Sequence, residues 1–104
     1  MIVFNGIEWG LFLVSPTHSQ LDMGNGRFAL GVCDDDLKAI YINKELKPYY
    51  LKQALAHELT HAAAFSYGEK LTREEHEYLA DFIVSHGENI VDITDSIMKK
   101  KGIQ

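Results

Sequence analysis

The residues with the clearest potential for chemistry form the run His57-Glu58-Leu59-Thr60-His61, which is followed by three alanines. Side chains four residues apart on a helix lie one turn above each other, so His57 and His61 can hold one metal ion between their imidazoles. Glu58 shares their side of the helix, where its carboxylate can act on whatever the metal binds. The pattern therefore predicts a metal centre with a general base beside it.

The helix that carries this run is predicted to begin near Pro48, a residue well suited to the first helical position, and to end at Gly68, a natural left-handed cap. At the helical period its core-facing stripe consists of Leu51, Leu55, Leu59 and Ala62. The two histidines therefore flank the core, and their nearest helical neighbours are alanines that leave space for a metal, a substrate or a second helix.

A second helix is predicted from Thr72, whose side chain can form a capping box with Glu75. It is expected to run to about His86, with Gly87 behind it. On this helix Glu77 and Asp81 stack one turn apart. A short link from residues 68 to 71 lets the two helices pack against each other, so Glu77 can face the two histidines across the interface.

A third helix is predicted over residues 89–101, where Ile90, Ile93 and Ile97 recur at core spacing and Gly102 follows. Its last turn carries Lys99-Lys100-Lys101, cations that offset the helix dipole.

The first part of the chain is predicted to be extended. Residues 2–4 and 7–14 flank the turn dipeptide Asn5-Gly6, residues 15–27 read as a loop, and residues 28–33 and 37–43 form a hairpin around Asp34-Asp35-Asp36. That acidic run lacks the spacing of a calcium loop, and turn formation explains it. Together the elements predict an α+β fold, a small antiparallel sheet of about three strands packed with two to three helices.

Composition limits the classes of protein that remain. A chain of 104 residues with 46% hydrophobic and 24% charged residues predicts one globular domain over residues 1–104. The net charge of −5 argues against nucleic-acid binding. No signal peptide and no apolar run of membrane-spanning length is visible, and the single cysteine, Cys33, suits a reducing compartment, so we expect a cytoplasmic protein without membrane contact. The sequence leaves the oligomeric state open.

The motifs on the two predicted helices resemble those of the gluzincin metallopeptidases, which carry H-E-x-x-H on one helix and E-x-x-x-D on the next. This resemblance implies that His57, His61 and Glu77 bind zinc, that Glu58 is the general base, and that Asp81 orients His57. Many relatives show E-A-N where this chain has Leu79-Ala80-Asp81. For that reason Asp81, Glu74 and Glu75 stay open as alternatives to Glu77.

The wider frame is similar to the small ImmA/IrrE-type metallopeptidases of phages and mobile elements. The likeness covers roughly residues 9 to 86, including Ile40-Tyr41-Ile42-Asn43 and the approach to the histidine motif through Gln53. It implies a minimal zincin-like architecture and a peptide or protein substrate, such as a transcriptional repressor. Gluzincins bind an extended peptide along an exposed strand edge beside the zinc, and the segments 28–33 and 37–43 are the candidates for that edge.

Three function classes follow from these residues. A zinc endopeptidase needs three protein ligands, an open fourth position and a base, and the retention of Glu58 favours it. A metal-stabilised binding module would keep the ligands without turnover, and a metal-free interaction domain would need none of them. The residue that stabilises the oxyanion stays open, and the candidates by position are Tyr50, Tyr78, His76 and His18.

Overall fold

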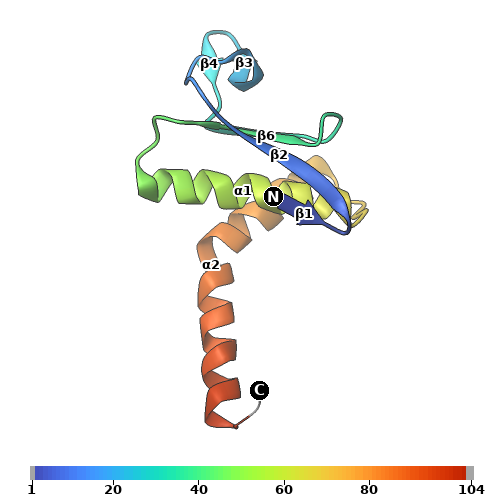
Figure 1. The fold of residues 1–104 in the computed structure, drawn as a ribbon, viewed down its shortest axis with the longest axis vertical. Coiled ribbons are helices and arrows are strands. Elements are labelled where there is room, and N and C mark those ends of the chain that lie inside the picture. The colour runs from blue at the N-terminus through green and yellow to red at the C-terminus, as the bar shows by residue number, and fades with distance from the viewer. Residues whose placement is uncertain (1, 103–104) are drawn as a thin grey trace.

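The computed structural model describes residues 2–102 and confirms the α+β class, with strands on one side and two helices on the other (Figure 1). In chain order the elements are β1 (Ile2–Phe4), β2 (Ile7–Val14), the 3₁₀ helix η1 (Ser19–Leu21), β3 (Asp22–Gly24), β4 (Arg27–Phe28), β5 (Gly31–Asp34), β6 (Ala39–Asn43), α1 (Pro48–Ser66) and α2 (Arg73–Lys100).

The main sheet has four strands in the order β1-β2-β6-β5. Both predicted hairpins are present, because β1 pairs antiparallel with β2 and β5 pairs antiparallel with β6. The central pair, β2 and β6, is parallel, so the sheet is mixed rather than the antiparallel sheet of about three strands predicted from the sequence. Tight turns specify the hairpins locally, whereas the pairing of β2 with β6 joins segments about thirty residues apart and follows from packing. One outer position of the sheet belongs to β5.

The segment between β2 and β5 is more ordered than the predicted loop over residues 15–27. It contains η1 and a second, two-stranded sheet of β3 and β4. Phe28 is the last residue of β4, so the strand that pairs with β6 begins at Gly31 and not at residue 28 as predicted. The turn at Asn25 and Gly26, both with positive φ, closes this small hairpin.

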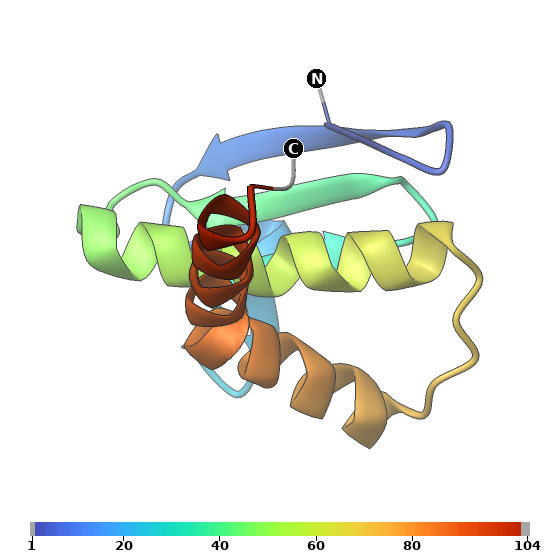
Figure 2. The same ribbon diagram turned by 90° about the horizontal axis from the view of Figure 1, so that it is seen from below.

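The core lies between the sheet and α1, which crosses one face of the sheet (Figure 2). Its fully enclosed members are Trp9, Ile40, Ile42 and Ala62. The indole Nε1–H of Trp9 donates a hydrogen bond of 2.7 Å to Ser66 Oγ, which fixes the last turn of α1 against β2. Because α1 is held along its length, the histidine run has a rigid support.

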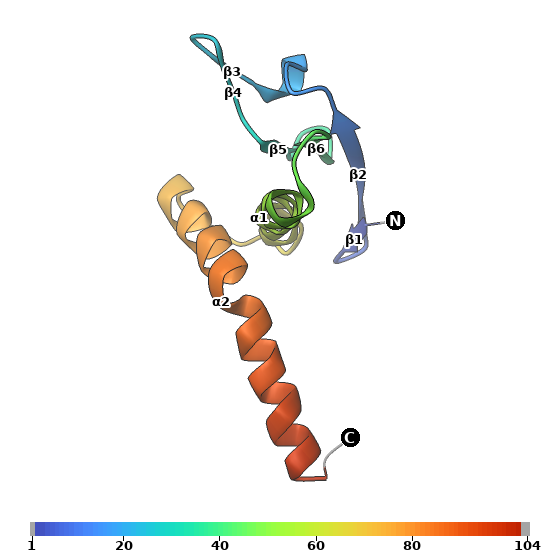
Figure 3. The same ribbon diagram turned by 90° about the vertical axis from the view of Figure 1, so that its left-hand side faces the viewer.

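The second helix corrects one prediction. Thr72 and Glu75 form the capping box expected from the sequence, but α2 then continues without a break to Lys100, so the separate helix predicted over residues 89–101 does not exist. Gly87 lies inside the helix, because one glycine costs only about 1 kcal/mol there, less than the loss of the hydrogen bonds around it. The first half of α2 packs beside α1, and the second half leaves the body of the molecule (Figures 1 and 3). Within residues 2–102 neither helix has the apolar length needed to cross a membrane.

Candidate metal centre

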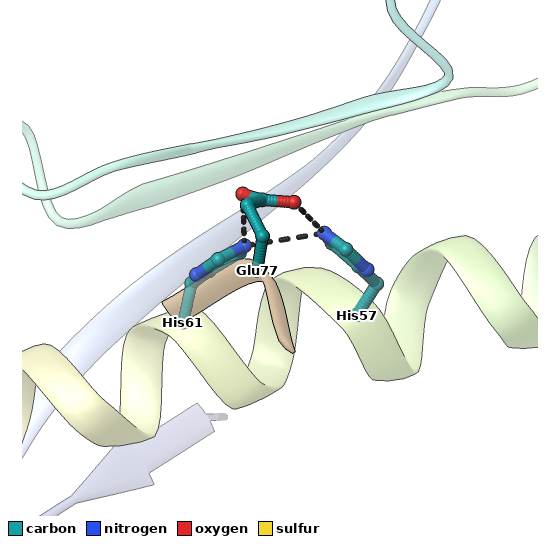
Figure 4. A group of neighbouring side chains, drawn as sticks. All are labelled: His57, His61 and Glu77. Atoms are coloured by element: carbon teal, nitrogen blue, oxygen red, sulfur yellow. Dashed lines mark hydrogen bonds and ion pairs between the residues drawn. The ribbon is translucent and has the colours of Figure 1, made fainter. Parts of the chain in front are cut away.

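Helices α1 and α2 bring His57, His61 and Glu77 together (Figure 4). The Nε2 atoms of the two histidines are 3.2 Å apart. One oxygen of the Glu77 carboxylate lies 3.2 Å from His57 Nε2, and the other lies 3.1 Å from His61 Nε2. All three residues present a ligand atom within 4.8 Å of the others, and the group could therefore hold a metal ion.

The geometry distinguishes among the four carboxylates that the sequence left open as a third ligand. Glu77 is the one grouped with both histidines among the described residues. Glu75 is used in the capping box, where hydrogen bonds from Thr72 lower the pKa of its carboxyl. Asp81 lies on the other side of His57, with Oδ1 3.3 Å from Nδ1. Glu77 is thus the carboxylate placed where it could bind a metal together with both histidines, and Asp81 lies where it could orient His57.

Glu58 lies beside this group but is turned toward the sheet. Its side chain is buried, with 8% exposed, although the carboxylate is charged in its ordinary state. Burial raises the pKa of Glu58 from 4.5 to about 7, a shift that the charge on His57 opposes and the carboxylate of Glu77 assists. A carboxyl whose pKa is near neutral can both accept and release a proton at physiological pH.

Gly31, the first residue of β5, makes room for Glu58. A Cβ at this position would lie 3.1 Å from Glu58 Cγ and 2.8 Å from Ile42 Cδ1, closer than such atoms pack. Gly31 is not among the residues that the motifs predict for the site. A glycine within a run of strand-forming residues nonetheless often marks a place where another group approaches the backbone closely. This signal could have predicted the contact of Gly31 with a neighbouring side chain.

His76 supports the second histidine. Its Nδ1 lies 3.2 Å from His61 Nδ1, the two rings stack with centroids 5.4 Å apart, and both side chains are buried. Burial lowers the pKa of His61. The charges of His57 and His76 act in the same direction, and the Glu77 carboxylate acts against it. The lowered pKa favours the neutral ring that metal binding requires. If His61 binds a metal through Nε2, the ring proton must be on Nδ1. His76 Nδ1 is placed to accept the hydrogen bond from this Nδ1–H.

Residues from both the helices and the sheet enclose the centre. A cavity of about 720 Å³ is lined by His57, Glu58, His61, His76 and Glu77 from the helices and by Gly31, Val32 and Cys33 from β5. Burial raises the pKa of the Cys33 thiol to about 12, and the negative charge of Glu58 is the second largest cause. The thiol therefore stays protonated and is a poor nucleophile at neutral pH.

The four candidates for an oxyanion donor have different surroundings. His18 caps η1 by accepting the Gln20 N–H, and its ring stacks on Tyr41. Tyr78 is 72% exposed. His76 is engaged with His61, as described above. Tyr50 lines a second cavity of about 340 Å³ together with His57, Glu58 and Gly31.

Comparisons of the chain with protein-family models, with curated proteins and with solved structures found no match.

Proposed function

We propose that this chain is a zinc-dependent peptidase of the gluzincin type, with His57, His61 and Glu77 as zinc ligands and Glu58 as general base. The observation that carries the proposal is the placement of a buried carboxyl with a pKa of about 7 next to three grouped ligand atoms, within one cavity. A site that only held a metal for stability would have no use for such a carboxyl, whose burial costs folding free energy.

The ligand set supports zinc. His57 Nε2 and His61 Nε2 lie 3.2 Å apart, and a different oxygen of Glu77 lies 3.1 to 3.2 Å from each of them. In tetrahedral coordination with bonds of about 2.0–2.2 Å, neighbouring ligand atoms lie about 3.3–3.6 Å apart, so small shifts of these side chains would make room for the ion. Two imidazoles and one carboxylate are also the ligand set of several catalytic zinc sites, in which the fourth position stays open.

The roles of the protein groups follow from their positions. Bound zinc would supply a Lewis acid that polarises a substrate carbonyl and lowers the pKa of a water molecule. Glu58 removes a proton from the attacking water and transfers it to the leaving amine, as its pKa of about 7 allows. Asp81 holds the His57 ring and His76 holds the His61 ring, so that both Nε2 atoms keep their direction.

The outer edge of β5 is the proposed place for the substrate. The Asn43 N–H donates to the Leu30 carbonyl at 2.9 Å, a bond that continues the register of β5 and β6 by one residue beyond the pair of Gly31 with Ile42. Because hydrogen-bonded pairs alternate along an antiparallel ladder, the backbone groups of Gly31 and Cys33 point to the open edge. An extended peptide paired there would run past Glu58 and His57.

Two cavities agree with an extended substrate. The cavities of about 720 Å³ and about 340 Å³ share Gly31, His57 and Glu58, so space for substrate residues exists on both sides of the proposed scissile bond. The class of substrate is part of the proposal as well. The resemblance to ImmA/IrrE-type peptidases supports a regulatory protein such as a phage or mobile-element repressor, in the cytoplasm.

The decisive experiment compares wild type with Glu58→Gln on a library of unstructured peptides, with cleavage read by mass spectrometry. Gln keeps the size of the side chain and leaves the three ligands intact, so zinc content should stay at one per chain. Loss of general-base assistance should lower the cleavage rate about 10²–10⁴-fold. Glu74→Gln is the matched control, because it removes one exposed carboxylate on α2 and should leave the rate unchanged.

Equal cleavage by wild type and Glu58→Gln would refute the proposed mechanism. If the wild type holds zinc and captures a protein partner but cleaves neither the library nor that partner, the binding-module alternative replaces the peptidase.

A further inference from the structure

The second half of α2 projects from the molecule and is exposed along its whole length (Figure 3). Every residue from Glu88 to Lys100 is exposed, and the helix extends away from the sheet and α1 (Figure 3). The radius of gyration is 15.7 Å, against about 13 Å expected for a compact chain of this length, and the longest dimension is 53 Å. A helix that leaves its own domain gains no tertiary packing, although such packing normally supplies most of a helix's stability.

The projecting helix carries a continuous apolar stripe. Ile83, Ile90 and Ile97 recur every seven residues, and Ile93 lies three residues after Ile90, which is the a and d spacing of a coiled coil. Ile90, Ile93 and Ile97 are 49%, 53% and 53% exposed. The sequence predicts these isoleucines at core spacing, yet the single chain leaves about half of each side chain in water.

The stripe begins in a groove. A cavity of about 680 Å³ lies between α1 and α2 and is lined by Tyr49 and Gln53 from α1 and by Ile83, Gly87, Ile90 and Val91 from α2. None of the proposed zinc ligands lines it. Gly87 presents no side chain, so a second helix can approach α2 closely at this point. The apolar surface therefore continues from the end of α2 onto the body of the molecule.

Charge indicates which partner fits and in which direction. Glu88, Asp92 and Asp95 lie in the first part of the projecting helix, and Lys99 to Lys101 follow at its end. Two such helices side by side in parallel would place both lysine clusters together. In the antiparallel arrangement each lysine cluster lies near the acidic part of the other helix, and the two helix dipoles are opposed.

We propose that residues 83–100 of α2 pair antiparallel with the same residues of a second copy, forming a homodimer. In the register given by a and d positions, Ile90 of each copy packs on Ile93 of the other, and Ile97 packs beside His86. The last turn of one α2 then enters the groove lined by Tyr49 and Ile83 of the other copy. The two metal centres are left free by this arrangement.

Sedimentation equilibrium of the full chain tests the dimer. Wild type should show twice the monomer mass of 11.8 kDa. Ile90→Asp should raise the dissociation constant at least tenfold, whereas the matched control Ser85→Asp, which adds the same charge at an exposed c position away from the stripe, should keep the wild-type value. Both positions are exposed in the single chain, so helix content by circular dichroism should be unchanged in both variants.

A wild type that stays monomeric well above micromolar concentration would overturn the proposal and leave the stripe to a partner of another sequence. Equal weakening by Ile90→Asp and Ser85→Asp would overturn it as well, because the stripe would then have no special role.

Cross-linking tests the direction in a Cys33→Ala background, where no native cysteine remains. In the antiparallel register a mixture of Ile97→Cys and His86→Cys chains should form an interchain disulfide. Ile97→Cys alone should not, because its two copies would be about 16 Å apart along the axis, beyond the reach of a disulfide. Efficient cross-linking of Ile97→Cys with itself would overturn the antiparallel arrangement.

Discussion

At the scale of single residues, the centre depends on a carboxyl that is costly to bury. Glu58 is enclosed by β5 and α1, and the missing side chain at Gly31 is what allows it to fit. The proposed zinc ligands are more open, since the Glu77 side chain is 53% exposed. The proposed base is therefore the more tightly positioned part of the site, and its environment can be tested apart from catalysis.

The raised pKa of Glu58 makes a prediction about stability without metal. A carboxyl whose pKa is raised from 4.5 to about 7 by folding contributes stability that is complete below pH 4.5 and is lost as the pH rises through about 7. Glu58→Gln stays neutral, so after chelation it should be more stable than wild type at about pH 8, by up to about 3 kcal/mol. Urea unfolding at several pH values measures the difference, which should vanish below pH 4.5. A difference that does not change with pH would show that the burial of the charge is not its cause.

Gly31 offers a second test at this scale. In Gly31→Ala the new methyl group would lie 2.8 Å from Ile42 Cδ1 and 3.1 Å from Glu58 Cγ, so both of these side chains must shift, and the carboxyl of Glu58 moves with its Cγ. Displacement of a catalytic group by a fraction of an ångström to 1 Å should lower peptide cleavage about 10- to 100-fold. Zinc content, measured by atomic absorption, should stay at one per chain because no ligand is touched. Loss of zinc together with activity would mean that the substitution disturbs α1 as a whole.

At the scale of elements, the site exists because α2 crosses α1 beside the histidine run. His76 faces His61, Glu77 faces both histidines, and Asp81, one turn further along α2, faces His57. The sheet contributes from the other side through β5, an outer strand whose edge lies beside the proposed base. The packing of two helices and one strand thus sets every contact of the centre.

The pairing of His61 with His76 predicts an effect on metal affinity. His76→Phe keeps a flat ring against His61 and Phe65 but removes the acceptor for the His61 Nδ1–H. Outer partners of this kind are typically worth 10- to 100-fold in metal affinity, so the zinc dissociation constant should rise by about that factor. Competition with a chromophoric chelator gives the constant. His86→Phe, on an exposed turn of the same helix, is the control and should match wild type.

At the scale of the whole molecule, metal binding should add a further link between two helices that already pack side by side. Glu77 is on α2 and the histidines are on α1, and a link of residues 67–72 is all that connects these helices in sequence. An ion held by all three would fix the two helices together. Folding and metal binding should therefore be coupled.

We expect zinc to raise the melting temperature of the protein. At a free concentration one hundred times the dissociation constant, binding to the folded state alone adds about 2.7 kcal/mol. Scanning calorimetry with zinc and with excess chelator measures the shift. His61→Ala removes a ligand and should abolish it, and a variant that keeps the full shift would contradict the assignment of that ligand.

The sequence by itself determined the features that depend on neighbours along the chain. The i, i+4 spacing places His57 and His61 on one side of a helix whatever surrounds it, and Pro48 marks where that helix begins. The capping box of Thr72 and Glu75, and the hairpins around Asn5-Gly6 and residues 34–38, likewise need only local hydrogen bonds and turn geometry.

The tertiary structure decided what depends on groups distant in sequence. The parallel pairing of β2 with β6, the approach of Gly31 to Glu58 and the contact of His76 with His61 all arise from packing, which no local pattern encodes. The continuity of α2 through Gly87 is of the same kind, because a small local preference for ending the helix competes with the hydrogen bonds of the whole element. The isoleucines after Gly87 depend on both the sequence and the tertiary structure. Their spacing is a property of the sequence, and their exposure is a property of the fold that points to a second copy of the chain.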